Sequence, residues 1–297
     1  MQLATDEGYH HCHSHTTSKT QARNEGLSDI VFFSTVIQTH CECITNCKSS
    51  RKVPMVIKKG PQLLIVFQIY RYPYYHLLKT DKALFNIPLH HNFTVSLINQ
   101  TLQYQQYAYK PLSKLFRPKE SLIAIWIGIN DINDSSKYSV DFAKFYENLI
   151  KTVFNSVTDL YNLGHRSFLF MNLPPLDRTP GNQASSSPHP NATQIKWYND
   201  ALIEHAHLFQ REKMDVEARV FDAHTHLSKI LDHPARYGIV NTTNYCAGYN
   251  QPDIEENYSN YGCPTPLDQY FWFNSGHMTS HVHQILAEEL QQWLKSS

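Results

Sequence analysis

The 297-residue sequence lacks the features that mark membrane-spanning or nucleic-acid-binding proteins. No stretch approaches the roughly 18 consecutive apolar residues of a membrane-spanning helix. The chain also has no excess charge, because 26 lysines and arginines balance 26 aspartates and glutamates. Nucleic acids and anionic membrane surfaces attract basic proteins, so we expect neither as a partner. Hydrophobic residues make up 41% of the chain and charged residues 18%, a composition typical of a globular protein with a full core.

The chain also lacks a recognisable signal peptide, since Met1 to His10 has neither a basic start nor an apolar core. Two other features nevertheless indicate the secretory route and predict an extracellular protein. Cys246 and Cys263 bracket a polar loop with little to pack against, which a disulfide would fix and stabilise by about 3 kcal/mol. Six Asn-x-Ser/Thr sequons begin at Asn92, Asn99, Asn133, Asn191, Asn241 and Asn257.

The composition changes near residue 60. Residues 1–60 are polar, and we interpret them as a disordered segment or one foreign to the domain that follows; residues 61–297 are predicted to form one domain. The early cysteines and histidines allow a zinc site to be sketched, but the C-x-C-x3-C spacing is not that of a structural zinc module. We therefore predict no metal and no other cofactor. The cysteines in this segment are Cys12, Cys41, Cys43 and Cys47.

From about Ser121 onward, short apolar runs alternate with stretches of helical periodicity. This alternation predicts a parallel sheet that helices cover on both faces. The predicted strands are 62–70, 121–127, 166–175 and 218–223. The predicted helices are 138–163, capped by Gly164, then a stretch through Trp197 and Phe209, then 224–231 and 277–294, with a loop over 179–191.

Two motifs could carry chemistry. A Gly-Ile-Asn-Asp sequence, 128–131, follows a predicted strand, and sites in parallel α/β sheets form where strands end. Asn130 could donate its amide into a cleft there, although an ordinary turn is the alternative. Near the C-terminus, Asn274 precedes His277 by three residues, which suits an orienting group and a general base. The alternative is a surface histidine near the start of a helix.

Together with two further stretches, these motifs resemble the fungal SGNH/GDSL-type serine hydrolases, nearest to the secreted group placed in carbohydrate esterase family 16. The resemblance runs from about Thr80 to the C-terminus, with the stretches in the family's order. It implies a three-layer α/β/α sandwich with a mostly parallel, flavodoxin-like sheet, whose first strand is missing or altered here. It also implies a monomer that hydrolyses a small-molecule or carbohydrate ester. The four stretches are IAIWIGINDIND, GHRSFLFMNLPPLDRTP, FDAHTHLSKILDHPARYGIVNTTNYC and FWFNSGHMTSHVH.

The family's mechanism assigns roles to the two motifs. Its members attack the ester with the serine of a Gly-Asp-Ser motif, whose proton passes to a histidine near the C-terminus. By resemblance, His277 is this base and Asn274 orients it. Asn130 supplies the side-chain donor of the oxyanion hole, and Gly128 lets the turn approach the site. One such donor is typically worth about 2.7–4 kcal/mol of transition-state stabilisation.

The first third of the chain departs from the family pattern. The sequence contains no Gly-Asp-Ser, and Ser34 resembles the nucleophile by position only. Leu77 and Leu78 stand where a glycine N–H should bind the oxyanion. We interpret these departures as a segment foreign to the family, such as translated intron or frame-shifted sequence, with the family sequence resuming near Thr80. A catalytically inactive relative is the alternative.

These features predict an ester hydrolase by descent whose activity in this chain is negligible. The alternative function is non-catalytic carbohydrate binding in the same cleft. Trp126, Trp197 and Trp272 are then candidates to stack on a pyranose ring, although aromatic residues in such strands and helices more often belong to the core.

Overall fold

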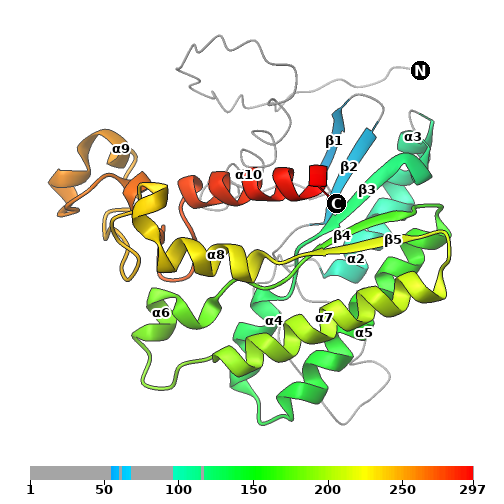
Figure 1. The fold of residues 1–297 in the computed structure, drawn as a ribbon, viewed down its shortest axis with the longest axis horizontal. Helices are drawn as coiled ribbons and strands as arrows, with labels where there is room; N and C mark the ends of the chain where they lie inside the picture. The colour runs from blue at the N-terminus through cyan, green and yellow to red at the C-terminus, as the bar shows by residue number, and fades with distance from the viewer. Residues whose placement is uncertain (1–54, 60–61, 68–95, 115–116, 297) are drawn as a thin grey trace, which may run out of the picture.

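The computed structural model describes residues 55–59, 62–67, 96–114 and 117–296. These residues form three layers, with helices on both faces of a central sheet (Figure 1). This arrangement confirms the predicted α/β/α class.

The sheet has five described strands in the order β1-β2-β3-β4-β5. β1 (Met55–Lys59) runs antiparallel to β2 (Gln62–Phe67) at one edge. From β2 onward the strands run parallel to one another: β3 (Ser121–Ile125) pairs with β2, β4 (Ser167–Met171) with β3, and β5 (Glu217–Phe221) with β4. β1 lies within the segment 1–60, whose other residues are outside the described part, and the domain boundary at residue 60 stays a prediction.

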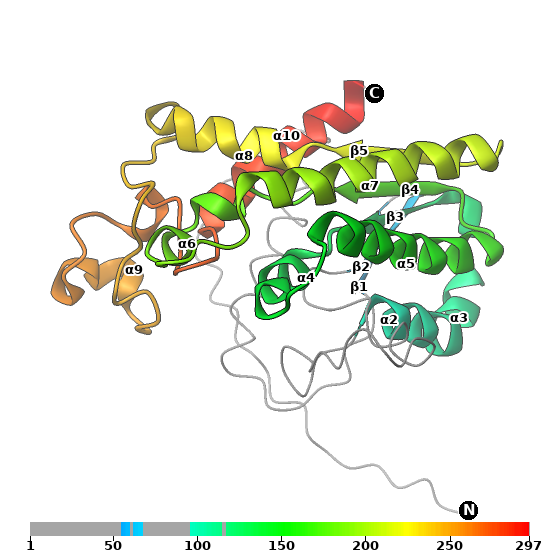
Figure 2. The ribbon, with the colours of Figure 1, turned by 90° about the horizontal axis from the view of Figure 1, so that it is seen from below.

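Helices cover both faces of the sheet, as Figure 2 shows from below, with one group packed on each face. The first group is α2 (Leu97–Gln103), α5 (Phe142–Asn162) and α7 (Ala192–Glu212); the second is α8 (Ala223–Asp232) and α10 (Ser280–Ser296). The short helices are α3 (Tyr109–Ser113), α4 (Ile129–Asp134), α6 (Pro180–Gln183) and α9 (Ile254–Asn257), with a π-helical turn η2 (Tyr104–Ala108). The 3₁₀ turns are η3 (Pro118–Glu120), η4 (Ser135–Lys137), η5 (Leu176–Arg178), η6 (Pro234–Tyr237), η7 (Tyr258–Tyr261) and η8 (Leu267–Gln269).

The alternation of side chains along β3 explains why its sequence is apolar throughout. Ile123 and Ile125 belong to the core cluster that α2, α5 and α7 cover. Ala124 and Trp126 point the other way, into the cluster formed with α8 and α10. A strand buried on both faces has no polar face to show, so it reads as a continuous apolar run.

The helix boundaries follow local capping chemistry. The helix predicted over 138–163 is confirmed as α5, but it begins at Phe142 because the Asp141 carboxylate caps it by accepting from the Lys144 N–H (3.2 Å). Gly164, in the left-handed region at φ +99°, follows its end and donates its N–H to the Tyr161 carbonyl (2.8 Å). The loop predicted over 179–191 contains the short helix α6.

The prediction that the last helix begins at His277 is wrong. Residues 272–278 form a hairpin, with an antiparallel bridge between Trp272 and Met278. The Phe273 N–H donates to the His277 carbonyl (2.7 Å), which holds this segment in an extended form, and α10 starts only at Ser280. His277 therefore lies in the turn before the helix.

Cys246 and Cys263 form a disulfide with their Cα atoms 5.4 Å apart. Both cysteines are buried with Ile254 and Tyr270 in a small cluster away from the main core. The disulfide thereby closes the lobe that contains α9 (Figure 1). Among the described helices, none is long and apolar enough to cross a membrane.

Gly128 is held at the end of β3 by close packing against α7. It adopts φ +109°, and a Cβ built on it would lie 2.1 Å from the hydroxyl oxygen of Tyr198. That hydroxyl donates to the carbonyl of Ile127 (2.8 Å), so α7 and the end of β3 are joined at this point. Only glycine combines this backbone conformation with so close a neighbour.

We expect Gly128→Ala to lower the free energy of unfolding by about 2–5 kcal/mol, because backbone strain adds to a clash with a buried ring. Gly238→Ala is the matched control, since Gly238 also has a positive φ (+69°) but a Cβ added there would have nothing within 4 Å. Urea unfolding of both variants measures the difference. Equal losses in the two variants would show that the Tyr198 contact is not the constraint.

Candidate functional site

Asn130 lies at the carboxyl edge of the sheet, in the first turn of α4. β3 ends at Ile125, two further buried residues follow, and Gly128 then turns the chain into the helix. The Asn130 side chain is half-buried there. The structure thus places it where ligand sites of parallel α/β sheets form, and its role as an oxyanion donor stays a prediction. For Gly128 the structure shows a packing reason, the contact with Tyr198.

His277 and Asn274 lie together at the tip of the hairpin before α10. The Asn274 side-chain oxygen accepts from the His277 backbone N–H (2.9 Å) and from the Gly276 N–H (3.0 Å). Because these two partners are donors, the atom is the amide oxygen, and His277 Nδ1 at 2.9 Å must donate to it as well. This fixes the tautomer that leaves the lone pair on Nε2, as a general base requires.

A backbone contact anchors the tip of this hairpin to α6. The Gly181 N–H donates to the Ser275 carbonyl (2.8 Å), and a Cβ on Gly181 would lie 3.0 Å from that oxygen. At the base of the hairpin the Trp272 indole N–H donates to the Thr242 carbonyl (2.8 Å). The imidazole is therefore carried by a segment held at both ends.

The Gly-Ile-Asn-Asp helix and the histidine hairpin border the same cavity, of about 440 Å³. Asn133 and Ser136 contribute from α4 and η4, and Ser275 and Gly276 contribute from the hairpin tip. Both segments therefore contribute to the wall of one cavity, although neither Asn130 nor His277 is among the described residues that line it.

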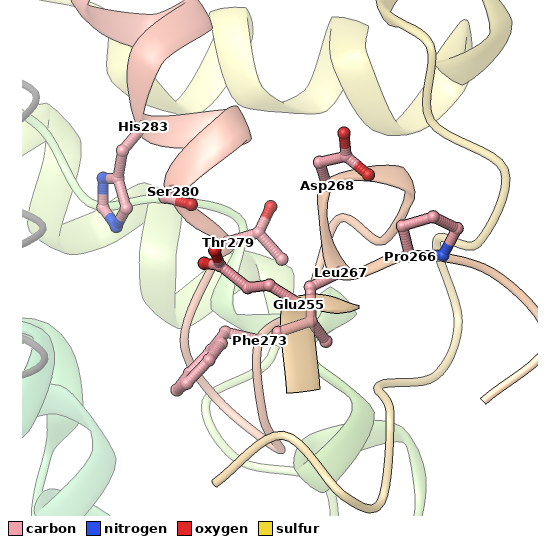
Figure 3. Close-up of a pocket in the computed structure, with 8 residues that line it drawn as sticks. All are labelled: Glu255, Pro266, Leu267, Asp268, Phe273, Thr279, Ser280 and His283. Carbon is pink, nitrogen blue, oxygen red and sulfur yellow. The ribbon is translucent and has the colours of Figure 1, made fainter. Parts of the chain in front are cut away.

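A second pocket, of about 280 Å³, lies along the arms of the hairpin and the start of α10. Figure 3 shows Glu255, Asp268 and His283 around it, with Phe273 from the hairpin. Burial and the nearby His277 lower the pKa of His283 to about 4. His283 is therefore neutral at pH 7 and does not add a positive charge beside His277.

Asp131 is a buried carboxylate, although its sequence context indicates only a turn former. It is 2% exposed, and neither carboxylate oxygen has a hydrogen-bond partner within the described residues. Burial raises the pKa of Asp131 to about 8. The sequence offered no signal for this, because burial of a polar residue after a strand depends on what packs over it.

A buried serine–histidine pair elsewhere in the fold is not a second candidate site. Ser121 Oγ lies 2.6 Å from His165 Nδ1, and Tyr104 Oη lies 2.9 Å from His165 Nε2. All three side chains are about 1% exposed, and Ser121 starts β3, so the pair lies at the opposite edge of the sheet from Asn130. Burial lowers the pKa of His165 to about 4, and no substrate could reach this serine.

Several predicted features lie outside the described residues: the nucleophile candidate Ser34, the leucines at 77 and 78, and the four early cysteines. Within the described part of the chain, no cluster of three or more His, Cys, Asp or Glu could hold a metal ion. Of the three tryptophans considered for sugar stacking, Trp126 and Trp272 are core residues at 4% and 2% exposure. Trp197, on α7, is 40% exposed.

Desolvation lowers the pKa of His277 below its ordinary value of 6.5. Asn274 offers it no negative charge, whereas a carboxylate within about 4–6 Å would favour the protonated ring. We therefore expect Asn274→Asp to raise the pKa of His277 by about 1 unit or more. Titration of the His277 ring protons by NMR measures this without any need for turnover. The exposed His207 is the internal control, and an unchanged His277 titration would contradict the contact.

The raised pKa of Asp131 predicts a pH-dependent stability. The folded protein keeps a proton that the unfolded chain releases above its ordinary pKa of 3.8, so the free energy of unfolding should fall as the pH rises from about 4 to 8. Asp131→Asn carries no titrating group, and we expect it to be more stable than the wild type by ~1 kcal/mol or more at pH 8 and similar at pH 4. Denaturant unfolding at both pH values measures this difference. A wild type that is the more stable protein at pH 8 would indicate an ionised, well-bonded carboxylate instead.

Comparison with known proteins places this site in a family context. An acetylesterase of Thermothelomyces thermophilus is 24% identical over 215 residues, which cover 71% of this chain and 65% of that protein. GDSL esterase/lipase 3 of Arabidopsis thaliana is 25% identical over 181 residues, covering 54% of this chain and 49% of that protein. GDSL esterase/lipase 4 of the same plant is 26% identical over 181 residues, covering 54% and 48%. The chain thus spans between about half and 65% of the length of these relatives.

The family described as GDSL-like Lipase/Acylhydrolase matches residues 80–290, a range that contains Asn130, Asn274 and His277. This match covers more than half of the chain and begins where the sequence resemblance begins. The protein belongs to the GDSL-like lipase/acylhydrolase family.

Proposed function

We propose that this chain descends from carboxylic-ester hydrolases that act on acetyl esters of carbohydrates, and that the part from about Thr80 onward keeps some of their catalytic groups. The observation that carries this proposal is the hydrogen bond from His277 Nδ1 to Asn274 Oδ1 (2.9 Å), in a hairpin that shares a cavity with the Gly-Ile-Asn-Asp helix. Family membership supports the ester chemistry, and the acetylesterase relative supports the acyl group.

In the proposed mechanism, His277 Nε2 removes the proton from a serine hydroxyl as the serine oxygen attacks the ester carbonyl carbon. The amide of Asn130 donates to the oxyanion of the tetrahedral intermediate. The proton on Nε2 then passes to the departing alcohol, and water releases the acyl group by the same steps. Asn274 holds the ring in the correct tautomer, but it cannot stabilise the protonated imidazole as a carboxylate would.

The nucleophile is the missing part of this machinery in the sequence. Ser34 is the candidate by position only, and no Gly-Asp-Ser is present. For this chain we therefore propose negligible turnover. The Cys246–Cys263 disulfide and the six sequons support an extracellular location, and we propose a monomer.

The second candidate function is carbohydrate binding without catalysis. The lack of a Gly-Asp-Ser motif favours it, because binding needs no nucleophile. The burial of Trp126 and Trp272 removes them as stacking platforms, so this function would depend on the exposed Trp197 or on the cavity.

Hydrolysis of p-nitrophenyl acetate tests the two functions. We expect the purified chain to match the buffer rate, and His277→Ala to match it as well. Hydrolysis above the buffer rate that disappears in His277→Ala would contradict the expected inactivity and identify an active esterase. If that activity survived in Ser34→Ala, Ser34 would be excluded as the nucleophile.

A further inference from the structure

We propose that the cavity of about 440 Å³ beside the histidine hairpin is a binding site for an uncharged pyranose ring. The proposal deepens the proposed function by giving the sugar a place in the site. Only the expectation that the bound sugar carries an ester rests on the proposed function, because binding a sugar requires no nucleophile. The cavity falls within the range of about 300–1,000 Å³ typical of small-molecule sites.

The described residues that line the cavity are mostly polar and uncharged. Among the described residues that line it, none is Asp, Glu, Lys or Arg, and most carry hydroxyl or amide groups. His189 also lines it; burial lowers the pKa of His189, so the ring is neutral at pH 7, and its Nε2 lies 2.9 Å from the Ile132 carbonyl. The described part of this wall offers no ion pair to a uronic acid or an amine, and it leaves an acyl chain beside polar groups.

Several lining groups are available to a ligand. The side chains of Asn133, Ser187 and Ser275 are exposed and make no hydrogen bond to other described residues. A set of amides and hydroxyls without partners suits a ligand that carries many hydroxyl groups, each of which both donates and accepts.

The cavity also contains one aromatic ring that offers an apolar surface. Phe142 lines the cavity, is partly buried, and packs at 5.3 Å between ring centroids against His189. The C–H face of a pyranose is apolar and packs on such a ring while its hydroxyls bond to the polar wall. Ser275 and Gly276, which stand between Asn274 and His277 in the sequence, also line the cavity, so a sugar bound here would lie beside the hairpin that carries His277.

A sugar in this cavity could also come from a second source, an N-linked glycan of the chain itself. Asn133 and Asn191 both line the cavity and both begin sequons, so the first sugar of an N-linked glycan could occupy it. The two sources differ in whether the empty cavity binds free sugar. We assign the cavity to free sugar, and the experiment separates the two.

The test uses the full chain produced in a bacterial host that adds no N-glycans. Cellobiose and N,N′-diacetylchitobiose are the uncharged probes, digalacturonic acid is the charged control, and binding is measured by saturation-transfer NMR and calorimetry. We expect the uncharged probes to bind at least tenfold more tightly than the charged one. Ser187→Trp should weaken that binding at least tenfold by filling the cavity.

Ser186→Trp is the matched control, because Ser186 is an exposed neighbour that does not line the cavity. We expect it to bind within twofold of the wild type. Absence of binding to both uncharged probes, or equal losses in the two tryptophan variants, would overturn the proposal. Two results together would assign the cavity to the N-linked glycan instead. The unglycosylated chain would bind none of the probes, and in secreted protein a glycan on Asn133 or Asn191 would resist endoglycosidase. Ester hydrolysis is measured separately. A chain that binds these sugars supports this site whether or not it shows turnover, whereas a chain that hydrolyses the ester and binds neither sugar overturns this site and leaves the ester chemistry standing.

Discussion

The contact between Tyr198 and Gly128 is the constraint on which the candidate site depends. The Tyr198 ring occupies the space where any other residue at 128 would place its Cβ, and its hydroxyl donates to the Ile127 carbonyl (2.8 Å). This fixes where the chain leaves β3 and begins α4, and therefore the position of Asn130 in the first turn of that helix. The same α4 continues to Asn133 at the wall of the cavity. One packing contact between a helix and the end of a strand thus sets both the predicted oxyanion donor and part of the proposed sugar site.

A neutral partner for the histidine is the second physical feature of the site. Asn274 fixes the orientation and tautomer of His277 through three hydrogen bonds to one oxygen, and it leaves the pKa of the imidazole to be set by desolvation. A site built this way keeps its base unprotonated to lower pH than a carboxylate partner would allow. It gives up the charge stabilisation that a carboxylate offers in the transition state. Asn274 therefore orients the His277 ring without stabilising the positive charge of its protonated form.

The sequence predicted the regular elements from Ser121 onward with few errors. Continuous apolar runs predicted β3, β4 and β5, because both faces of these strands are buried, and three-residue and four-residue spacing predicted α5, with Gly164 as its cap. The start of α10 was wrong because main-chain hydrogen bonds of the 272–278 hairpin compete with helix formation, and side-chain periodicity does not report them. The short helix α6 was missed for a similar reason, since Thr179 caps it within a stretch rich in proline and serine.

The sequence by itself determined the family and the layered α/β/α class, and it supplied candidate residues for the chemistry. These follow from local order: motif letters, their spacing and the period of apolar residues. Only the tertiary structure decided that Asn274 bonds to His277 through a turn before a helix and that Asp131 is buried without a described partner. It also decided that α4 and the histidine hairpin line one cavity, whose described lining residues include no Asp, Glu, Lys or Arg. Such facts depend on which groups meet across the fold. Distances between residues far apart in the chain are set by packing, and no local pattern encodes them.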